Sequence, residues 1–279
     1  MKMTRRLASG QLMALAWMAT TSPLSAFAQD FDHQHEAWTS LLRRHVVLIS
    51  SGHASQLKYS GMAKDRQQLR AYLDSLSAVT AASFEAFTKP QQMAFLINAY
   101  NAFTVELILT RYPKLKSIKD LGSLLSSPWK KDFISLLGST ISLDHIEQDM
   151  LRRRGRYDDP RIHFAVNCAS IGCPMLREEA YVAQHLDAQL SQQAERFLSD
   201  HSRNRFNSDT GRLEVSKIFD WYGDDFNQGH QGIRSLKSFL ARYAELLATR
   251  APDREAIRAE RATVGFLEYD WRLNDAAAR

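Results

Sequence analysis

The sequence predicts an α+β fold: a helix-rich single domain around a small, mostly antiparallel sheet, with one buried central helix. Most segments repeat apolar residues at helical spacing, whereas segments rich in β-formers are short and joined as hairpins. One segment, residues 91–112, is apolar on nearly every side, and a helix of that kind is buried inside a domain. Because no internal repeat or Gly-Ser linker divides the chain, we expect residues 29–279 to form a single globular domain.

Residues 1–28 have the pattern of a cleaved export signal. Three cations near the start precede an apolar stretch at 12–18, and the small residues Ala26 and Ala28 precede Gln29. The apolar stretch is too short for a membrane span, so we expect cleavage after Ala28 and a bacterial protein of the periplasm or the medium. Cleavage lowers the formal net charge of +5 by three. No long run of Lys and Arg remains, so nucleic-acid binding is not expected.

Helical spacing predicts the helices in chain order. They are 31–50, 65–76, a short one starting at Ser83, the buried 91–112, 117–125, 144–153, 182–198, 233–247 and 254–261. Asp144 and Glu147 have the spacing of a capping box at the start of one of them. That interpretation explains both acids without assigning them acid–base chemistry.

Strands are predicted at four places. Residues 162–166 form a short apolar run between Asp-Pro and Gly-Cys-Pro, which indicates a buried strand. Residues 133–137 and 140–142 flank a Gly-Ser turn and predict a hairpin, as do 205–207 and 213–215 around Asp-Thr-Gly. Residues 264–269 predict a closing strand.

The stretch 159–174 contains both cysteines of the chain. On a regular strand His163 and Asn167 would share one face and Cys168 the other. Cys168 and Cys173 are close enough in sequence to bridge a tight turn, and an oxidising compartment would permit it. A disulfide between them and two free thiols both stay open, because the bond requires a specific geometry.

Two asparagines lie within the buried segment. Asn98 and Asn101 are three residues apart and share one helical stripe. Buried amides usually hydrogen-bond backbone groups, so we expect them to tie the helix to a neighbouring loop. The alternative is that they face a cleft.

Five ordered motifs carry a family resemblance. They are Ile97–Ala102, Ser142–Glu147 with Leu151-Arg152, Asp159–Pro174, Asp220–Tyr222 with Asp225-Phe226, and Tyr269–Asn274. Together they resemble the bacterial and plant family catalogued as domain of unknown function 547, over roughly residues 41–274. The resemblance implies that His163 and Cys168 belong to the family pattern, and it implies no reaction. Plant relatives lack the second cysteine, here Cys173, which implies that a disulfide is not a requirement of the fold.

Two functions remain open. The first is an exported binding protein with a polar site around His163, whose partner is an unknown peptide, small molecule or envelope component. The second is a papain- or transglutaminase-like thiol-dependent hydrolase or acyltransferase, with Cys168 as nucleophile and His163 as base. Asn98, Asn101 or Asn167 would then orient the imidazole or bind an oxyanion. Under both hypotheses we expect His163, Cys168 and one of the helix asparagines to converge on one concave site.

Metal binding has little support from the sequence. Cys168, Cys173, His163 and His185 are of ligating types, but they lack the paired spacing typical of zinc sites. We therefore predict no metal site and no cofactor.

Overall fold

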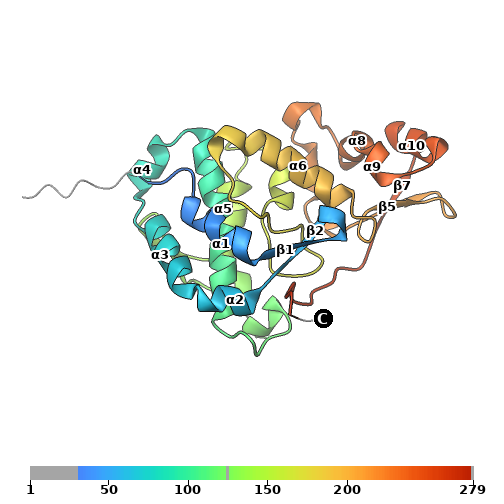
Figure 1. Cartoon of the computed structure of the whole chain (residues 1–279). Helices are drawn as coiled ribbons and strands as arrows, with labels where there is room; N and C mark the ends of the chain where they lie inside the picture. Colours follow the sequence, from blue (N-terminus) through green and yellow to red (C-terminus); the bar gives the residue numbers. More distant parts are fainter. Residues whose placement is uncertain (1–30, 124–125, 278–279) are drawn as a thin grey trace, which may run out of the picture. The chain divides into compact units, whose positions relative to one another are not determined.

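The computed structural model describes residues 31–123 and 126–277 and confirms the predicted α+β class (Figure 1). The predicted export signal at 1–28 lies outside the described residues. The α-helices are α1 (Glu36–His45), α2 (Tyr59–Lys64), α3 (Arg66–Ser77), α4 (Ala81–Ala86), α5 (Lys89–Leu109), α6 (Leu186–Leu198), α7 (Ile218–Trp221), α8 (Leu236–Ala241), α9 (Ala244–Leu247) and α10 (Ala251–Arg258).

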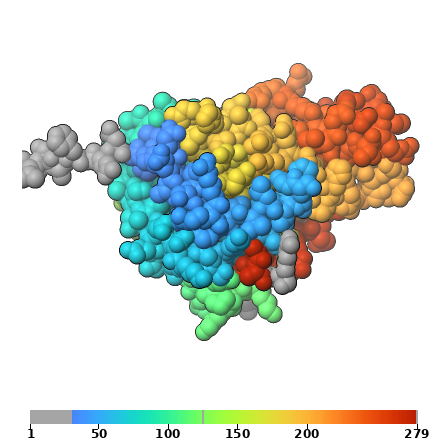
Figure 2. Space-filling view, viewed as in Figure 1, coloured from blue at the N-terminus to red at the C-terminus, as the bar shows by residue number. Residues whose placement is uncertain are grey.

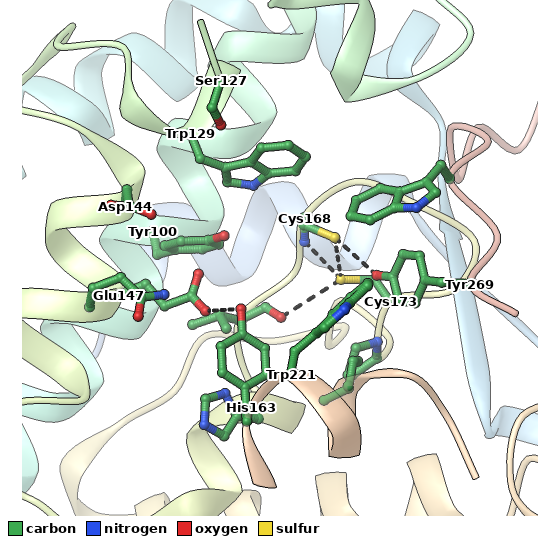
Figure 3. Close-up of a pocket in the computed structure, with 16 residues that line it drawn as sticks. Tyr100, Ser127, Trp129, Asp144, Glu147, His163, Cys168, Cys173, Trp221 and Tyr269 are labelled. Atoms are coloured by element: carbon green, nitrogen blue, oxygen red, sulfur yellow. Dashed lines mark hydrogen bonds between the residues drawn. The ribbon is translucent and has the colours of Figure 1, made fainter. Parts of the chain in front are cut away.

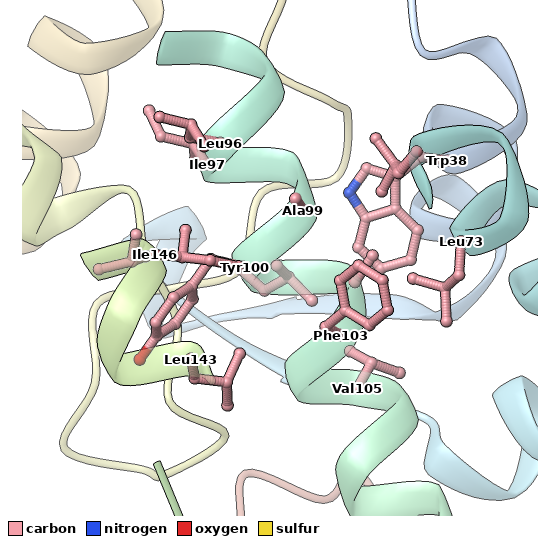
Figure 4. Close-up of a cluster of buried hydrophobic side chains, with 14 of the residues drawn as sticks. Trp38, Leu73, Leu96, Ile97, Ala99, Tyr100, Phe103, Val105, Leu143 and Ile146 are labelled. Carbon is pink, nitrogen blue, oxygen red and sulfur yellow. The ribbon is translucent and has the colours of Figure 1, made fainter. Parts of the chain in front are cut away.

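Helix α5 is the central helix, as predicted. It begins in a capping box in which Thr88 and Gln91 satisfy each other's backbone N–H groups. Of its 21 residues, 17 are buried. Helix α3 packs along it, and Figure 4 shows Trp38 and Leu73 on one side and Leu143 and Ile146 on another.

In the part of the chain that the structure describes, the strands form three small sheets rather than one. They are β1 (Val46–Ile49) with β2 (Ala54–Leu57), β3 (Ile134–Leu136) with β4 (Ser139–Ile141), and β5 (Arg205–Asn207), β6 (Arg212–Val215) and β7 (Thr263–Phe266). All neighbours are antiparallel except β6 and β7, which run parallel. Both predicted hairpins are present, but the first turns at Leu137 and Gly138 rather than at Gly138 and Ser139, so Ser139 belongs to β4. The predicted helix 31–50 is too long, because the chain leaves helical geometry after His45 and enters β1.

The predicted strand 162–166 is wrong. Residues Pro160–Phe164 form a 3-10 helix, η5, which Asp159 caps by accepting a hydrogen bond from the Arg161 backbone N–H. Proline at the first helical position and aspartate at the cap favour a helical turn. The apolar run at 162–166 could not distinguish a strand from a helical turn, because both can be buried.

The capping-box interpretation of Asp144 and Glu147 is also wrong. Residues His145–Leu151 form a π-helix, η4, and Asp144 makes no side-chain capping bond. Ser142 accepts the hydrogen bond from the His145 backbone N–H instead, at 3.1 Å. The Glu147 side chain is therefore not part of a helix cap and can contact other groups. Single π-helical turns are frequent at functional sites.

The core of the described residues consists of two hydrophobic clusters. The α5 cluster surrounds α5 and includes Ile162, Ala165 and Val166. The C-terminal cluster surrounds Phe197, Phe219 and Phe239 and includes Phe164. The second half of η5 therefore lies where the two clusters meet.

The C-terminal segment, residues 267–277, returns to the first half of the fold. Its backbone hydrogen-bonds to Leu57 of β2. It also hydrogen-bonds to Ala169 and Ile171 of the cysteine-containing loop, residues 167–174. Figure 2 shows its red atoms beside the blue atoms of the β1–β2 hairpin. Among the described residues, no helix combines the length and apolar character needed to cross a bilayer.

Candidate functional site

A cavity of about 280 Å³ opens where the two clusters meet (Figure 3). Its lining comes from α5, η3 (Pro128–Lys130), η4, η5, the cysteine-containing loop, α7 and the C-terminal segment. The lining residues used below are Tyr100, Trp129, Asp144, Glu147, His163, Cys168, Cys173, Trp221, Tyr222, Tyr269 and Trp271.

An aromatic arc forms one wall. Trp271 lies 4.5 Å from Tyr269, 5.6 Å from Trp221 and 5.7 Å from Trp129, measured between ring centroids. Trp221 is 42% exposed, which is high for a tryptophan in a folded chain. Partly exposed rings at a concave surface are typical of binding sites, because they offer large contact area at low entropic cost.

The charged lining of the cavity is acidic. Glu147 is almost fully buried and accepts a hydrogen bond of 2.7 Å from the Tyr222 hydroxyl. Asp144 lies one helical turn before it. None of the described residues lining the cavity is Lys or Arg. Burial and the neighbouring Glu147 raise the pKa of Tyr222, so its hydroxyl keeps its proton and donates.

His163 is hydrogen-bonded to Asp225 of η7 (Gly223–Asn227). Its Nε2 lies 2.7 Å from Asp225 Oδ2, and its ring stacks on Tyr222 at 4.0 Å. Arg152 pairs with the same carboxylate at 2.6 Å. Burial opposes ionisation of Asp225, but hydrogen bonds from His163 and Arg152 outweigh it and hold its pKa well below the usual range. Among the described residues, no hydrogen-bond partner reaches His163 Nδ1.

Cys168 is half-buried and lines the cavity as a free thiol. Its Sγ lies 2.9 Å from Cys173 Sγ, 3.0 Å from the Ser170 hydroxyl and 3.2 Å from the Tyr269 hydroxyl. The contact to Cys173 contributes most, and with the two hydroxyls it outweighs burial and lowers the pKa of Cys168. The two sulfurs are near each other but are not bonded, so of the two alternatives left open by the sequence this structure has the two free thiols.

Asn98 and Asn101 do not line the cavity. Asn98 donates to the Tyr181 carbonyl at 2.7 Å and accepts from the Tyr181 N–H at 3.0 Å. Asn101 donates to the Ala165 carbonyl at 2.9 Å and accepts from the Asn167 N–H at 2.8 Å. Both amides hold backbone segments in place, and Asn101 thereby positions the loop that carries Cys168.

His163 and Cys168 thus line one cavity, each hydrogen-bonded to other groups. Among the described residues, no imidazole hydrogen-bonds the Cys168 thiol, whose partners are Cys173, Ser170 and Tyr269. The Nε2 atom of His163 is committed to Asp225. In the described part of the chain, no three His, Cys, Asp or Glu side chains gather as metal ligands would.

Sequence reasoning missed most of the cavity wall. Trp129 follows a Ser-Pro turn, Trp221 and Tyr222 end a one-turn helix, and Trp271 lies in the C-terminal segment. Aromatic residues in irregular segments, outside any amphipathic repeat, were the available signal. Functional side chains concentrate in such connecting segments.

Residues 84–198 match the family described as "Protein of unknown function, DUF547". The predicted resemblance is confirmed over this range, which includes α5, His163 and both cysteines and is shorter than the range expected. Neither a curated protein nor a solved structure matched the chain.

Proposed function

We propose that this is an exported binding protein of the bacterial envelope, whose cavity takes a small organic cation such as an alkylammonium group. One observation carries the proposal. Aromatic side chains from four separate parts of the chain converge on a cavity where, among the described residues, the Asp, Glu, Lys and Arg of the lining are all acidic. An electron-rich wall next to carboxylates complements positive charge, since a ring face attracts cations.

One ring of the wall already makes a cation–π contact within the protein. The ammonium group of Lys119 lies 3.6 Å from the centroid of Trp271, and Lys119 is not among the residues lining the cavity. Because this charge opposes a second cation at the same ring, a ligand cation is expected at the other rings of the wall, next to the carboxylates.

The thiol-dependent hydrolase or acyltransferase has weaker support. Such an enzyme needs a base within hydrogen-bond reach of the nucleophile. The thiol of Cys168 has hydroxyl and thiol partners instead, and His163 is stacked and hydrogen-bonded away from it. Binding requires only the wall and the carboxylates, so it is the function that the geometry favours.

Choline and its neutral carbon isostere dimethylbutanol test the proposal, because the two have the same shape and differ in charge. Three of the five tryptophans of the chain line the cavity, so intrinsic fluorescence reports binding. A desolvated cation–π contact is worth about 2 kcal/mol, so choline should bind about 30-fold more tightly than the isostere. Equal affinity for the two would refute the preference for a cation.

Glu147→Gln keeps the shape of the side chain and its contact with Tyr222 while removing the charge. Choline affinity should fall by about fivefold, the effect of roughly 1 kcal/mol for a partly solvated charge pair. Asp149→Asn is the matched control, because Asp149 is an exposed acid of the same π-helix that does not line the cavity. A decrease of the same size in both variants would indicate a general charge effect.

Export is part of the proposal and has its own test. The cations, apolar stretch and small residues of 1–28 support cleavage between Ala28 and Gln29. N-terminal sequencing of protein recovered from the periplasm or the medium should begin at Gln29. An uncleaved chain retained in the cell would contradict export.

A further inference from the structure

We propose that Cys168 and Cys173 form a redox-active dithiol that exchanges with low-molecular-weight disulfides entering the cavity. This activity goes beyond cation binding and does not depend on it. The proposal stands on four features of the structure: the different exposure of the two thiols, the donors around Cys168, the fixed loop between them and the cavity above.

The two thiols are placed unequally. Cys168 is half-buried and lines the cavity, whereas Cys173 is only 6% exposed. Their sulfurs are 2.9 Å apart, and Figure 3 shows them between Tyr269 and Trp221 on one side and Tyr100 on the other. An accessible sulfur with a second one directly behind it is the arrangement that thiol–disulfide exchange requires.

Hydrogen bonds favour ionisation of the accessible sulfur. The hydroxyls of Ser170 and Tyr269 lie within reach of Cys168 Sγ, and so does the Cys173 thiol. The backbone N–H of Cys168 in turn donates to Cys173 Sγ at 2.9 Å. Burial and the adjacent Cys168 raise the pKa of Cys173, so this thiol keeps its proton and can donate to Cys168. Thiolate is the reactive form in exchange.

The loop between the cysteines is fixed at both ends. Asn167 accepts a hydrogen bond from the Ala169 N–H and donates one to the Pro174 carbonyl. Gly172 donates to the Asp270 carbonyl at 2.8 Å, and a Cβ at this glycine would lie 3.0 Å from the Asp270 nitrogen. A side chain there would push the C-terminal segment away. The loop therefore holds the two sulfurs together without a covalent bond.

The exchange is balanced without a cofactor. The Cys168 thiolate attacks one sulfur of a disulfide RSSR, the S–S bond breaks, and the leaving thiolate takes up a proton. Cys173 then loses its proton and attacks Cys168 Sγ, which releases the second RSH and forms the Cys168–Cys173 bond. The two cysteines are oxidised by two electrons and the incoming disulfide is reduced by two. A cavity of about 280 Å³ suits a small disulfide rather than a folded protein.

Cystamine–cysteamine buffers of increasing oxidised fraction test the proposal on the folded protein, because this small cationic disulfide suits the acidic lining of the cavity. After an acid quench, maleimide labelling and mass spectrometry count the free thiols and any adduct. We expect the wild type to lose two hydrogens and both thiols together, with no stable cysteamine adduct. A wild type that keeps both thiols under conditions that oxidise the same chain in guanidinium would overturn the proposal.

Single variants separate the two roles. Cys173→Ser should accumulate one cysteamine on Cys168, whereas Cys168→Ser should leave Cys173 unmodified in the folded state. Equal modification of the two variants would overturn the assignment. If a variant does not fold, brief iodoacetamide labelling of the reduced wild type replaces it, and Cys168 should react about tenfold faster than Cys173 or more. Equal labelling would again refute the assignment.

Tyr269 acts as a positioning residue in this proposal. Tyr269→Phe removes one hydrogen-bond donor from Cys168 and keeps the ring, so the pH at which Cys168 becomes reactive should rise. Glu147 and Asp144 also face the cavity and are unchanged in this variant. Tyr243→Phe, in the C-terminal cluster, is the control and should leave the pH profile unchanged. An unchanged profile for Tyr269→Phe would exclude its part in stabilising the thiolate.

Discussion

Replacing Asn101 by alanine should be among the most damaging single changes in this chain. The side chain is 2% exposed, and both ends of its amide bond to backbone groups of the segment between η5 and Cys168. Asn101→Ala leaves the Ala165 carbonyl and the Asn167 N–H buried and unpaired. Each such group costs about 1–3 kcal/mol, so the free energy of unfolding should fall by about 2–6 kcal/mol.

Guanidinium unfolding followed by tryptophan fluorescence measures this loss. Domains of ordinary size have about 5–15 kcal/mol of stability in total, so the expected change should be large relative to it. Asn227→Ala is the matched control, because Asn227 is an exposed asparagine of η7 and should change stability by less than about 0.5 kcal/mol. A loss for Asn101→Ala no larger than that of the control would refute the account of the amide as a structural clamp.

Three further predictions concern the core and the titrating groups. Leu96→Ala should destabilise the protein by about 2–5 kcal/mol because Leu96 is fully buried on α5, whereas Leu48→Ala at a 45% exposed leucine should do little; equal effects would place Leu96 outside the core. Burial lowers the pKa of His35 from 6.5 to about 4, so the unfolded chain binds the proton first and stability should fall by about 3 kcal/mol as pH decreases from 6.5 to 4. The decrease of the urea midpoint over this pH range should be much smaller in His35→Gln. It should be as large as in the wild type in His145→Gln, which removes an exposed histidine. Asp225→Asn should destabilise the protein at pH 7. Because the pKa of Asp225 in the folded protein lies below 3.8, the difference in stability from the wild type should shrink as pH falls below that value. A difference independent of pH would show that the charge of Asp225 does not contribute to stability.

The central helix and the hairpins could be predicted from sequence because their signals are local. Helix α5 is apolar on nearly every side, and that pattern allows only burial. The turn between β3 and β4 has Leu137 and Gly138 both at positive φ, which suits a two-residue hairpin connection. Such features depend on neighbours in the chain.

The turn at η5 could not be predicted in the same way. Residues 162–166 are buried whether they form a strand or a helical turn, so burial did not discriminate. In the structure Ile162 faces the α5 cluster while Phe164 enters the C-terminal cluster. Only the position of both clusters determines that arrangement, and their contacts join residues distant in the sequence.

The candidate site likewise contains residues that local sequence indicated and residues that it did not. His163 and Cys168 lie in the segment that the sequence singled out, and both line the cavity. The place of Glu147 in the cavity lining was missed because its spacing from Asp144 suggested a cap, whereas the π-helical turn brings it to Tyr222. The aromatic wall combines segments more than a hundred residues apart, and no local pattern could indicate that they meet.

The return of the C-terminal segment determines the order in which the protein can mature. Tyr59 donates a hydrogen bond to Asn274, 215 positions later, and the same segment brings Tyr269 and Trp271 to the cavity. A chain emerging from the ribosome can collapse around α5 long before these residues are synthesised, because domains begin to fold from the N-terminal side. The cavity, however, remains without its aromatic wall until the segment has been released and has closed this long loop.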